Sequence, residues 1–232
     1  MLVPATSAVA LLTQLNRSGG RPRITWYGDD FERVELSGAV LDNWVSKTTN
    51  LLVEEFDAAP GVRVLLDLPP HWRSLVWALA TWRTGATLTL TGPADVVVTT
   101  RPGEHAADAV VAVTLAALAR RFEGPLPRGA IDAASAVMTY ADVVGYVPPT
   151  DPGAAALDTT TYADLPGWWA DGDARRVAFG AGDDVAGWLR RVVATLAADG
   201  SVVAIAPGRL AELGSTDGAL DRLLETERAV LV

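Results

Sequence analysis

The chain has 232 residues, half of them hydrophobic, and a formal net charge of −9. This length allows one large domain or two small ones with a substantial core, and the negative charge argues against a nucleic-acid partner because phosphate neutralisation requires a basic surface. The chain has no cysteine, which excludes disulfides and thiolate chemistry and makes a cytoplasmic location the default expectation.

The first 20 residues are expected to form an amphipathic helix and not a signal peptide. No basic residue precedes their apolar run, and Gln14 and Asn16 end it. No stretch of the chain approaches the roughly 18 consecutive apolar residues that a membrane helix needs. We therefore expect no membrane partner.

A second helix is predicted over residues 37–56. Ser37 suits its N-cap position, where a hydroxyl can accept a hydrogen bond from the first turn. Apolar side chains then recur at three- and four-residue spacing, which is typical of one buried helix face. The members of this face are Val40, Leu41, Trp44, Val45, Thr48, Leu51, Leu52 and Phe56.

A strand–helix–strand pattern follows. Residues 62–68 are almost wholly apolar, as expected of a strand that is covered on both faces. Pro69 and Pro70 are expected in the first turn of a helix that extends to residue 86. Residues 87–90 and 95–100 are further strand candidates, and the alternation predicts βαβ units in a parallel sheet.

The middle of the chain has weaker patterns. Residues 108–122 begin like a strand and end like a helix, and residues 129–141 are expected to be helical. Residues 145–172 are rich in Gly, Pro, Asp and Thr, which is typical of a long connector.

Regular alternation returns after the connector. Residues 175–182 predict a strand and a turn, and Asp183 is expected to cap the next helix. The later expected elements are a helix at 183–200, a strand at 201–206, a helix at 218–227 and a strand at 228–232.

These elements predict an α/β protein with layered α-β-α architecture and mostly parallel sheets built from two βαβ blocks. The expected organisation is a first α/β subdomain at 1–144, a connector at 145–172 and a second βαβαβ block at 173–232. We expect both blocks to pack as one globular unit.

The order of short motifs in the N-terminal half resembles a known family. The motifs are Leu36-Ser37 with Leu41, Gly61 with Val64, Leu68-Pro69, and Thr84-Gly85-Ala86. Together they resemble the N-terminal entry of the adenylate-forming superfamily, which contains acyl-CoA synthetases and the adenylation domains of peptide synthetases. The chain looks most similar to a group of short actinobacterial adenylation-like proteins, and the resemblance implies the fold of a truncated N-terminal domain.

The same resemblance identifies residues 151–167 as a degenerate phosphate-binding loop. The family motif is T-S-G-T-T-G-x-P-K-G, and aligning Pro166 with its proline places Thr159 and Thr160 on its first threonine and serine. Asp164 then replaces a glycine and Gly167 replaces the lysine. Glycines let backbone N–H groups approach phosphates, and the lysine supplies the compensating charge. An acid in their place repels a polyanion, so the loop is not expected to hold ATP.

The resemblance therefore implies a non-catalytic relative of AMP-forming enzymes that acts in ligand or protein binding. The later family motifs, which include a catalytic lysine on a C-terminal domain, are absent from these 232 residues. No catalytic residue, cofactor or metal is expected. Two alternatives stay open, namely an enzyme half that needs a partner chain and an unrelated α/β small-molecule-binding module.

Four residues are candidates for ligand or partner contacts. His71 and Trp72 open a helix at the carboxyl end of a predicted strand, where open α/β sheets usually bind ligands. Trp168 and Trp169 lie in the connector and are expected to form an exposed aromatic pair. A small apolar or acyl-type ligand would suit these side chains. Uncovered apolar surface further predicts a homodimer or a complex with another protein.

Overall fold

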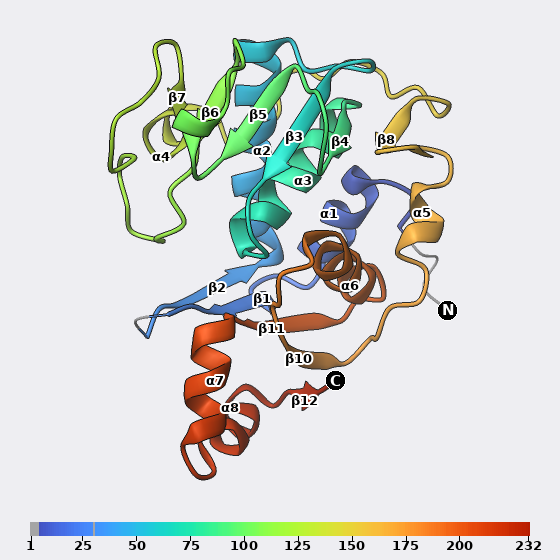
Figure 1. Ribbon diagram of the computed structural model, residues 1–232. Coiled ribbons are helices and arrows are strands. Elements are labelled where there is room, and N and C mark those ends of the chain that lie inside the picture. The colour runs from blue at the N-terminus through green and yellow to red at the C-terminus, as the bar shows by residue number, and fades with distance from the viewer. Residues whose placement is uncertain (1–4, 30) are drawn as a thin grey trace.

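The computed structural model describes residues 5–29 and 31–232, and within them two β-sheets enclose a layer of helices (Figure 1). The five-stranded sheet A has the strand order β12-β10-β11-β1-β2, and the seven-stranded sheet B has the order β7-β6-β5-β3-β4-β8-β9. The predicted α/β class with mostly parallel sheets is confirmed.

Sheet A combines strands from both ends of the chain. Its members are β1 (Pro22–Tyr27), β2 (Arg33–Ser37), β10 (Arg176–Gly180), β11 (Ser201–Ile205) and β12 (Val230–Leu231). β1 pairs in parallel with β11, although about 180 residues separate them in the chain, and only β2 runs antiparallel. Sheet A therefore contains strands from both sides of the expected connector at 145–172.

Sheet B contains the middle of the chain. Its members are β3 (Arg63–Asp67), β4 (Thr87–Thr89), β5 (Val96–Thr99), β6 (Val110–Ala112), β7 (Ile131–Asp132), β8 (Ala155–Leu157) and β9 (Thr160–Thr161). All neighbours pair in parallel except β8 and β9, which form an antiparallel hairpin at the edge of the sheet.

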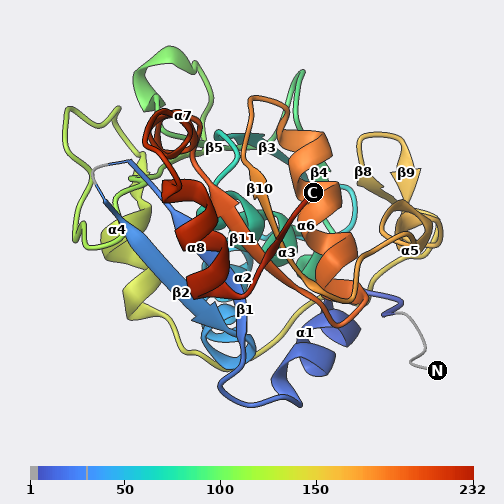
Figure 2. The same cartoon turned by 90° about the horizontal axis from the view of Figure 1, so that it is seen from below.

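The helices form two layers. α1 (Ala8–Asn16), α3 (Trp72–Thr84) and α6 (Val185–Ala197) lie between the sheets, and α2 (Gly38–Phe56) packs along α3 (Figure 1). α7 (Pro207–Ser215) and α8 (Ala219–Glu227) cover the other face of sheet A (Figure 2). None of the helices in the described ranges is long and apolar enough to cross a membrane.

The central layer of helices is tightly packed. Nearly every side chain of α3 is buried, including Trp72, Trp77 and Trp82. α1 and α2 approach so closely that a Cβ atom at Gly38 would lie 2.3 Å from the carbonyl oxygen of Leu15. Glycine is required there because a side chain would overlap the backbone of α1.

Two helix starts differ from the prediction by one or a few residues. Ser37 caps α2 as predicted and accepts a hydrogen bond from the Val40 N–H. Pro69 and Pro70, however, precede α3, which is capped by the side chain of His71. α6 is capped by Asp184 and not by Asp183, because the Asp184 carboxylate accepts from the Gly187 N–H at 3.1 Å.

The helix predicted over 129–141 is largely absent. The strand β7 forms at Ile131–Asp132, and only α4 (Ala133–Ala136) and a 3₁₀ turn, η2 (Val137–Thr139), are helical. Side chains of α2 bind the backbone carbonyls beyond this point, since Lys47 donates to Tyr140 O and Asn50 donates to the carbonyls of residues 141 and 143. These tertiary hydrogen bonds occupy backbone carbonyls that would accept intrahelical hydrogen bonds if the helix continued.

Other differences concern loops. The predicted helical end of 108–122 is irregular beyond β6, and α7 was not predicted. The connector at 145–172 contains the β8–β9 hairpin and α5 (Leu165–Trp168).

Candidate ligand-binding site

The segment that resembles a phosphate loop forms a tight hairpin and not an open loop. β8 ends at Leu157, and a two-residue turn of Asp158 and Thr159 leads directly into β9. Asp158 has a left-handed backbone with φ of 48°. Its N–H donates to Leu88 O, and its carboxylate accepts from the hydroxyl of Thr89 at 2.9 Å. The turn is therefore fixed to the carboxyl end of β4 by its own acid.

The second half of the segment lies at the opposite end of the hairpin. The hydroxyl of Tyr162 donates to the carbonyl of Ala86, which precedes β4. Asp164 accepts from the hydroxyl of Thr161 at 2.7 Å, and Pro166 and Gly167 belong to α5. Thr159 thus lies at one end of β9, whereas Pro166 and Gly167 follow its other end.

The charges around this hairpin are mainly negative. Asp158 and Asp164 are both exposed, and neither makes a salt bridge with a described residue. The cation in this network is Arg63, which lies on the neighbouring strand β3. Its guanidinium donates to the hydroxyl of Thr89 at 3.3 Å and to the carbonyl of Pro93 at 3.0 Å. Arg63 is thus bound to the sheet and not positioned on the loop.

A cavity of about 720 Å³ opens at the carboxyl ends of the strands, between the two sheets. We call it the inter-sheet cavity. Its walls follow the ends of β1, β3, β6 and β11, which is the edge where open α/β sheets usually bind ligands. The lining residues are Trp26, Gly28, Asp29, Glu32, Arg33, His71, Leu115, Ala116, Ala117, Leu118 and Ala206.

His71 lies in the wall of this cavity and is only 3% exposed. Its Nδ1 accepts a hydrogen bond from the Arg73 N–H at 3.2 Å, so the proton of the neutral ring is on Nε2. Burial, together with the nearby positive charge of Arg73, lowers the pKa of His71 to about 3. The ring is therefore an uncharged donor at neutral pH.

Trp26 provides a second donor next to His71. Their ring centroids are 4.6 Å apart in an edge-to-face arrangement. The indole Nε1 of Trp26 is buried and has no hydrogen-bond partner among residues 5–29 and 31–232. A Cβ atom at Gly28 would lie 2.9 Å from this nitrogen, so glycine leaves room beside it. Two donors without acceptors in one cavity wall suit a ligand with a carbonyl or carboxyl oxygen.

The other predicted contact residues are elsewhere. Trp72 is 2% exposed and lines a different, smaller cavity between α2 and α3. Trp169 is 1% exposed, and its Nε1 donates to Ala5 O at 3.1 Å. Trp168 is partly buried and packs edge-to-face on Trp82 at 5.8 Å. The expectation of an exposed aromatic pair is therefore wrong for Trp169, which packs against Trp82 and donates to the backbone of Ala5.

Two features of this edge were not predicted from the sequence. Trp26 was not singled out, although a tryptophan at the end of a strand is a recognisable signal. The carboxylate of Asp67, at the end of β3, accepts from Thr99, Arg101 and His105 at 2.6–3.3 Å. This cluster fastens the loop after β5 to β3. In the described parts of the chain, no group of three His, Cys, Asp or Glu residues could hold a metal ion.

The chain was compared with known proteins. No family model matches it. It is 38% identical over 166 residues to the TIGR03089 family protein of Mycobacterium tuberculosis, and the alignment covers 66% of this chain and 67% of that protein.

The structure is similar to adenylate-forming enzymes. For an acyl-CoA synthetase from Brucella canis the TM-score is 0.72 at 18% identity, covering 97% of this chain and 46% of that one. For an acetoacetyl-CoA synthetase from Streptomyces lividans the TM-score is 0.66 at 16% identity, with 86% and 38% covered. For a fatty acid AMP ligase from Legionella pneumophila it is 0.64 at 10% identity, with 97% and 43% covered. The chain spans less than half the length of each of these enzymes.

Proposed function

The chain belongs to the TIGR03089 family and has the fold of the N-terminal domain of adenylate-forming enzymes, and from this premise we propose that it binds a small apolar or acyl-type ligand without adenylating it. The observation that carries this proposal is the hairpin at 151–167. The acidic residues of this hairpin are expected to repel phosphates. The two halves of the segment also lie at opposite ends of β9.

The repulsion between the acidic residues of the hairpin and a phosphate has a definite magnitude. One unit charge pair at about 4 Å repels with roughly 1 kcal/mol in water and about 4 kcal/mol near a protein surface of lower effective dielectric constant. Asp164 takes the place of a motif glycine, Asp158 lies in the turn that directly precedes the aligned motif, and no lysine follows residue 47 in the chain. A triphosphate carries several charges, so these unfavourable contributions add. Arg63 cannot offset them fully, because its guanidinium already binds Thr89 and Pro93.

The inter-sheet cavity supports retained ligand binding. Its volume of about 720 Å³ is in the range of small-molecule sites, and Trp26 and His71 supply uncharged donors. An acyl or carboxylic ligand would place an oxygen on these two donors and its apolar part against Leu115 and Leu118.

ATP–pyrophosphate exchange with a panel of carboxylic acids tests this proposal. We expect no exchange above the no-enzyme background, while tryptophan fluorescence reports saturable binding of an acid or its ester. The matched variant Trp26→Phe keeps the ring but removes the indole N–H, and it should weaken that binding by about tenfold. Robust exchange by the purified chain would refute the proposal.

We also propose that the chain associates, as a homodimer or with another protein. β12 is an edge strand of sheet A, and Val230, Leu231 and Val232 are 45–48% exposed there. Exposed apolar side chains on an unpaired strand edge favour association. Light scattering at micromolar concentration should give a mass above 24.4 kDa for purified chain or for its complex. A monomer that captures no partner would contradict this part.

A further inference from the structure

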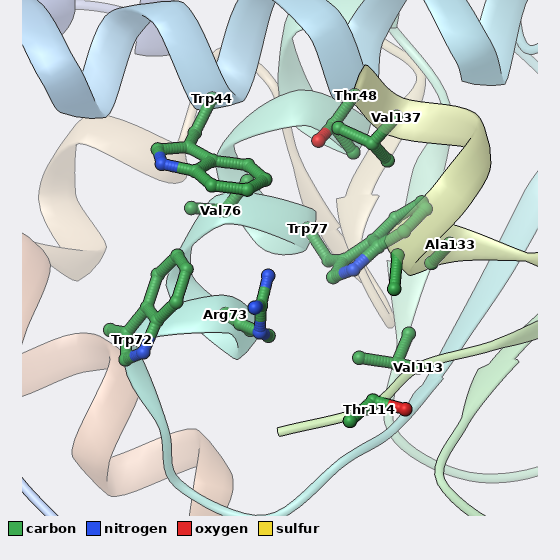
Figure 3. Close-up of a pocket in the computed structure, with 11 residues that line it drawn as sticks. Trp44, Thr48, Trp72, Arg73, Val76, Trp77, Val113, Thr114, Ala133 and Val137 are labelled. Carbon is green, nitrogen blue, oxygen red and sulfur yellow. The ribbon is translucent and has the colours of Figure 1, made fainter. Parts of the chain in front are cut away.

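Arg73, in the first turn of α3, is a buried cation held between aromatic rings. The residue is 8% exposed. Its guanidinium carbon lies 4.3 Å from the ring centroid of Trp72 and 5.3 Å from that of Trp44 (Figure 3). The two indole faces offset part of the cost of removing the charge from water.

The hydrogen bonds of Arg73 leave its charge incompletely compensated. Nη2 donates to the carbonyls of Ala116 and Ala117 at 3.2 and 3.4 Å, and Nε donates to Leu115 O at 3.4 Å. Nη1 has no hydrogen-bond partner in the described ranges, and no carboxylate there comes within 4.0 Å of the guanidinium. Glu32 acts on Arg73 only from a longer distance, since its Oε1 accepts from the Ala117 N–H. A buried charge without a counter-charge is costly.

A small cavity of about 20 Å³ lies directly against this guanidinium. A space of that size holds a guest somewhat larger than one water molecule, and it is far too small for a nucleotide or a phosphate ester. Its walls come from α2, α3, the segment after β6 and the turn of α4. No acidic residue is among them.

Trp77 and Thr48 provide further hydrogen-bond donors in these walls. The indole nitrogen of Trp77 is turned toward Arg73, and the hydroxyl of Thr48 extends from α2 toward the same space (Figure 3). Neither group donates to any residue that the structure describes, although both residues are at most 3% exposed. Three donors, one of them cationic, therefore line a small pocket whose walls contain no acidic residue.

We propose that this cavity binds one small monovalent anion, of the size of a halide, as the counter-ion of Arg73. The Arg73 Nη1 group, the Trp77 N–H and the Thr48 hydroxyl donate to it. The site is distinct from the inter-sheet cavity. The 115–117 loop lies between them, since it lines the inter-sheet cavity and its carbonyls accept from Arg73. An occupied site would fix the start of α3, and with it the position of the neighbouring His71.

Bromide titration tests the proposal. The purified chain is titrated with sodium bromide against sodium gluconate at constant ionic strength, while tryptophan fluorescence is recorded. Bromide held among three indole rings should quench the emission saturably in the millimolar range, whereas collisional quenching rises linearly. Trp77→Phe removes one donor and should raise the Kd about tenfold. Trp82→Phe is the matched control, since its N–H binds Ala156 O outside the cavity, and its Kd should equal that of the wild type.

Crystals soaked in bromide provide a second readout that needs no variant. An anomalous peak beside the Arg73 guanidinium would support the site. Competition by formate would assign the site to a carboxylate group of a ligand, and no competition would assign it to a free halide. Linear quenching with no anomalous peak at Arg73 would overturn the proposal.

Discussion

Replacing His71 with asparagine tests the assignment of this residue as a buried, neutral histidine. Asparagine is a good N-cap residue and can still accept a hydrogen bond from the Arg73 N–H. It cannot titrate. The variant therefore separates the pH dependence of His71 from its capping role.

The magnitude follows from the pKa of His71, which is about 3 in the folded chain and about 6.5 when unfolded. The unfolded state binds more protons between these values, so stability rises with pH through this window and is lost as the pH falls below about 6.5. From pH 7 to pH 5 the loss amounts to roughly 1.5 pKa units, or about 2 kcal/mol.

Urea denaturation of wild type and His71→Asn at pH 7 and pH 5 measures this difference. We expect the variant to lose about 2 kcal/mol less than the wild type over this interval. His71→Ala should show the same weakened pH dependence and an additional loss of about 1 kcal/mol at both pH values, because the cap is gone. Equal pH dependence in wild type and His71→Asn would refute the reasoning.

Two further predictions concern stability at pH 7, measured by thermal or urea unfolding. The Glu227 carboxylate is buried and binds Arg33 and Arg176. Glu227→Gln should therefore destabilise the fold by about 2 kcal/mol, which is less than the usual loss for a fully buried pair because Arg33 is partly exposed. An unchanged unfolding midpoint would contradict this. Gly38→Ala should cost about 2–3 kcal/mol because its Cβ overlaps the backbone of α1. Gly214→Ala in α7, where no atom lies within 4 Å, should instead stabilise the chain by about 0.5 kcal/mol. Similar effects of the two glycine variants would contradict the packing argument.

Elements with strong local patterns were predictable from the sequence. α2 has a capping serine and a continuous apolar face, and its N-cap and extent are as predicted. Strands β3, β4 and β5 of sheet B were predicted, whereas β7 fell in a predicted helix and β8 in the predicted connector. Where tertiary contacts override local preference, prediction failed. The alanine-rich stretch after Asp132 stops being helical because Lys47 and Asn50, about 90 residues earlier, bind its carbonyls.

The candidate site was only partly predictable, for a related reason. His71 could be placed at the carboxyl end of a strand because local order alone determines that position. The role of Trp26 depends on the pairing of β1 with β11, which lies about 180 residues away and brings the ends of the two strands to one edge. The burial of Trp169 likewise depends on contact with Ala5. Such long-range contacts leave no periodic pattern in the sequence.

A calorimetric titration of the purified chain with ATP and Mg²⁺ tests the central claim most directly. The hairpin at 151–167 carries Asp164 where the family loop has a glycine and Gly167 where it has a lysine, so we predict no saturable heat up to about 1 mM nucleotide. Saturable binding with one ATP per chain, lost in Thr159→Ala or Thr160→Ala, would contradict the account, because it would show that this hairpin still holds a triphosphate.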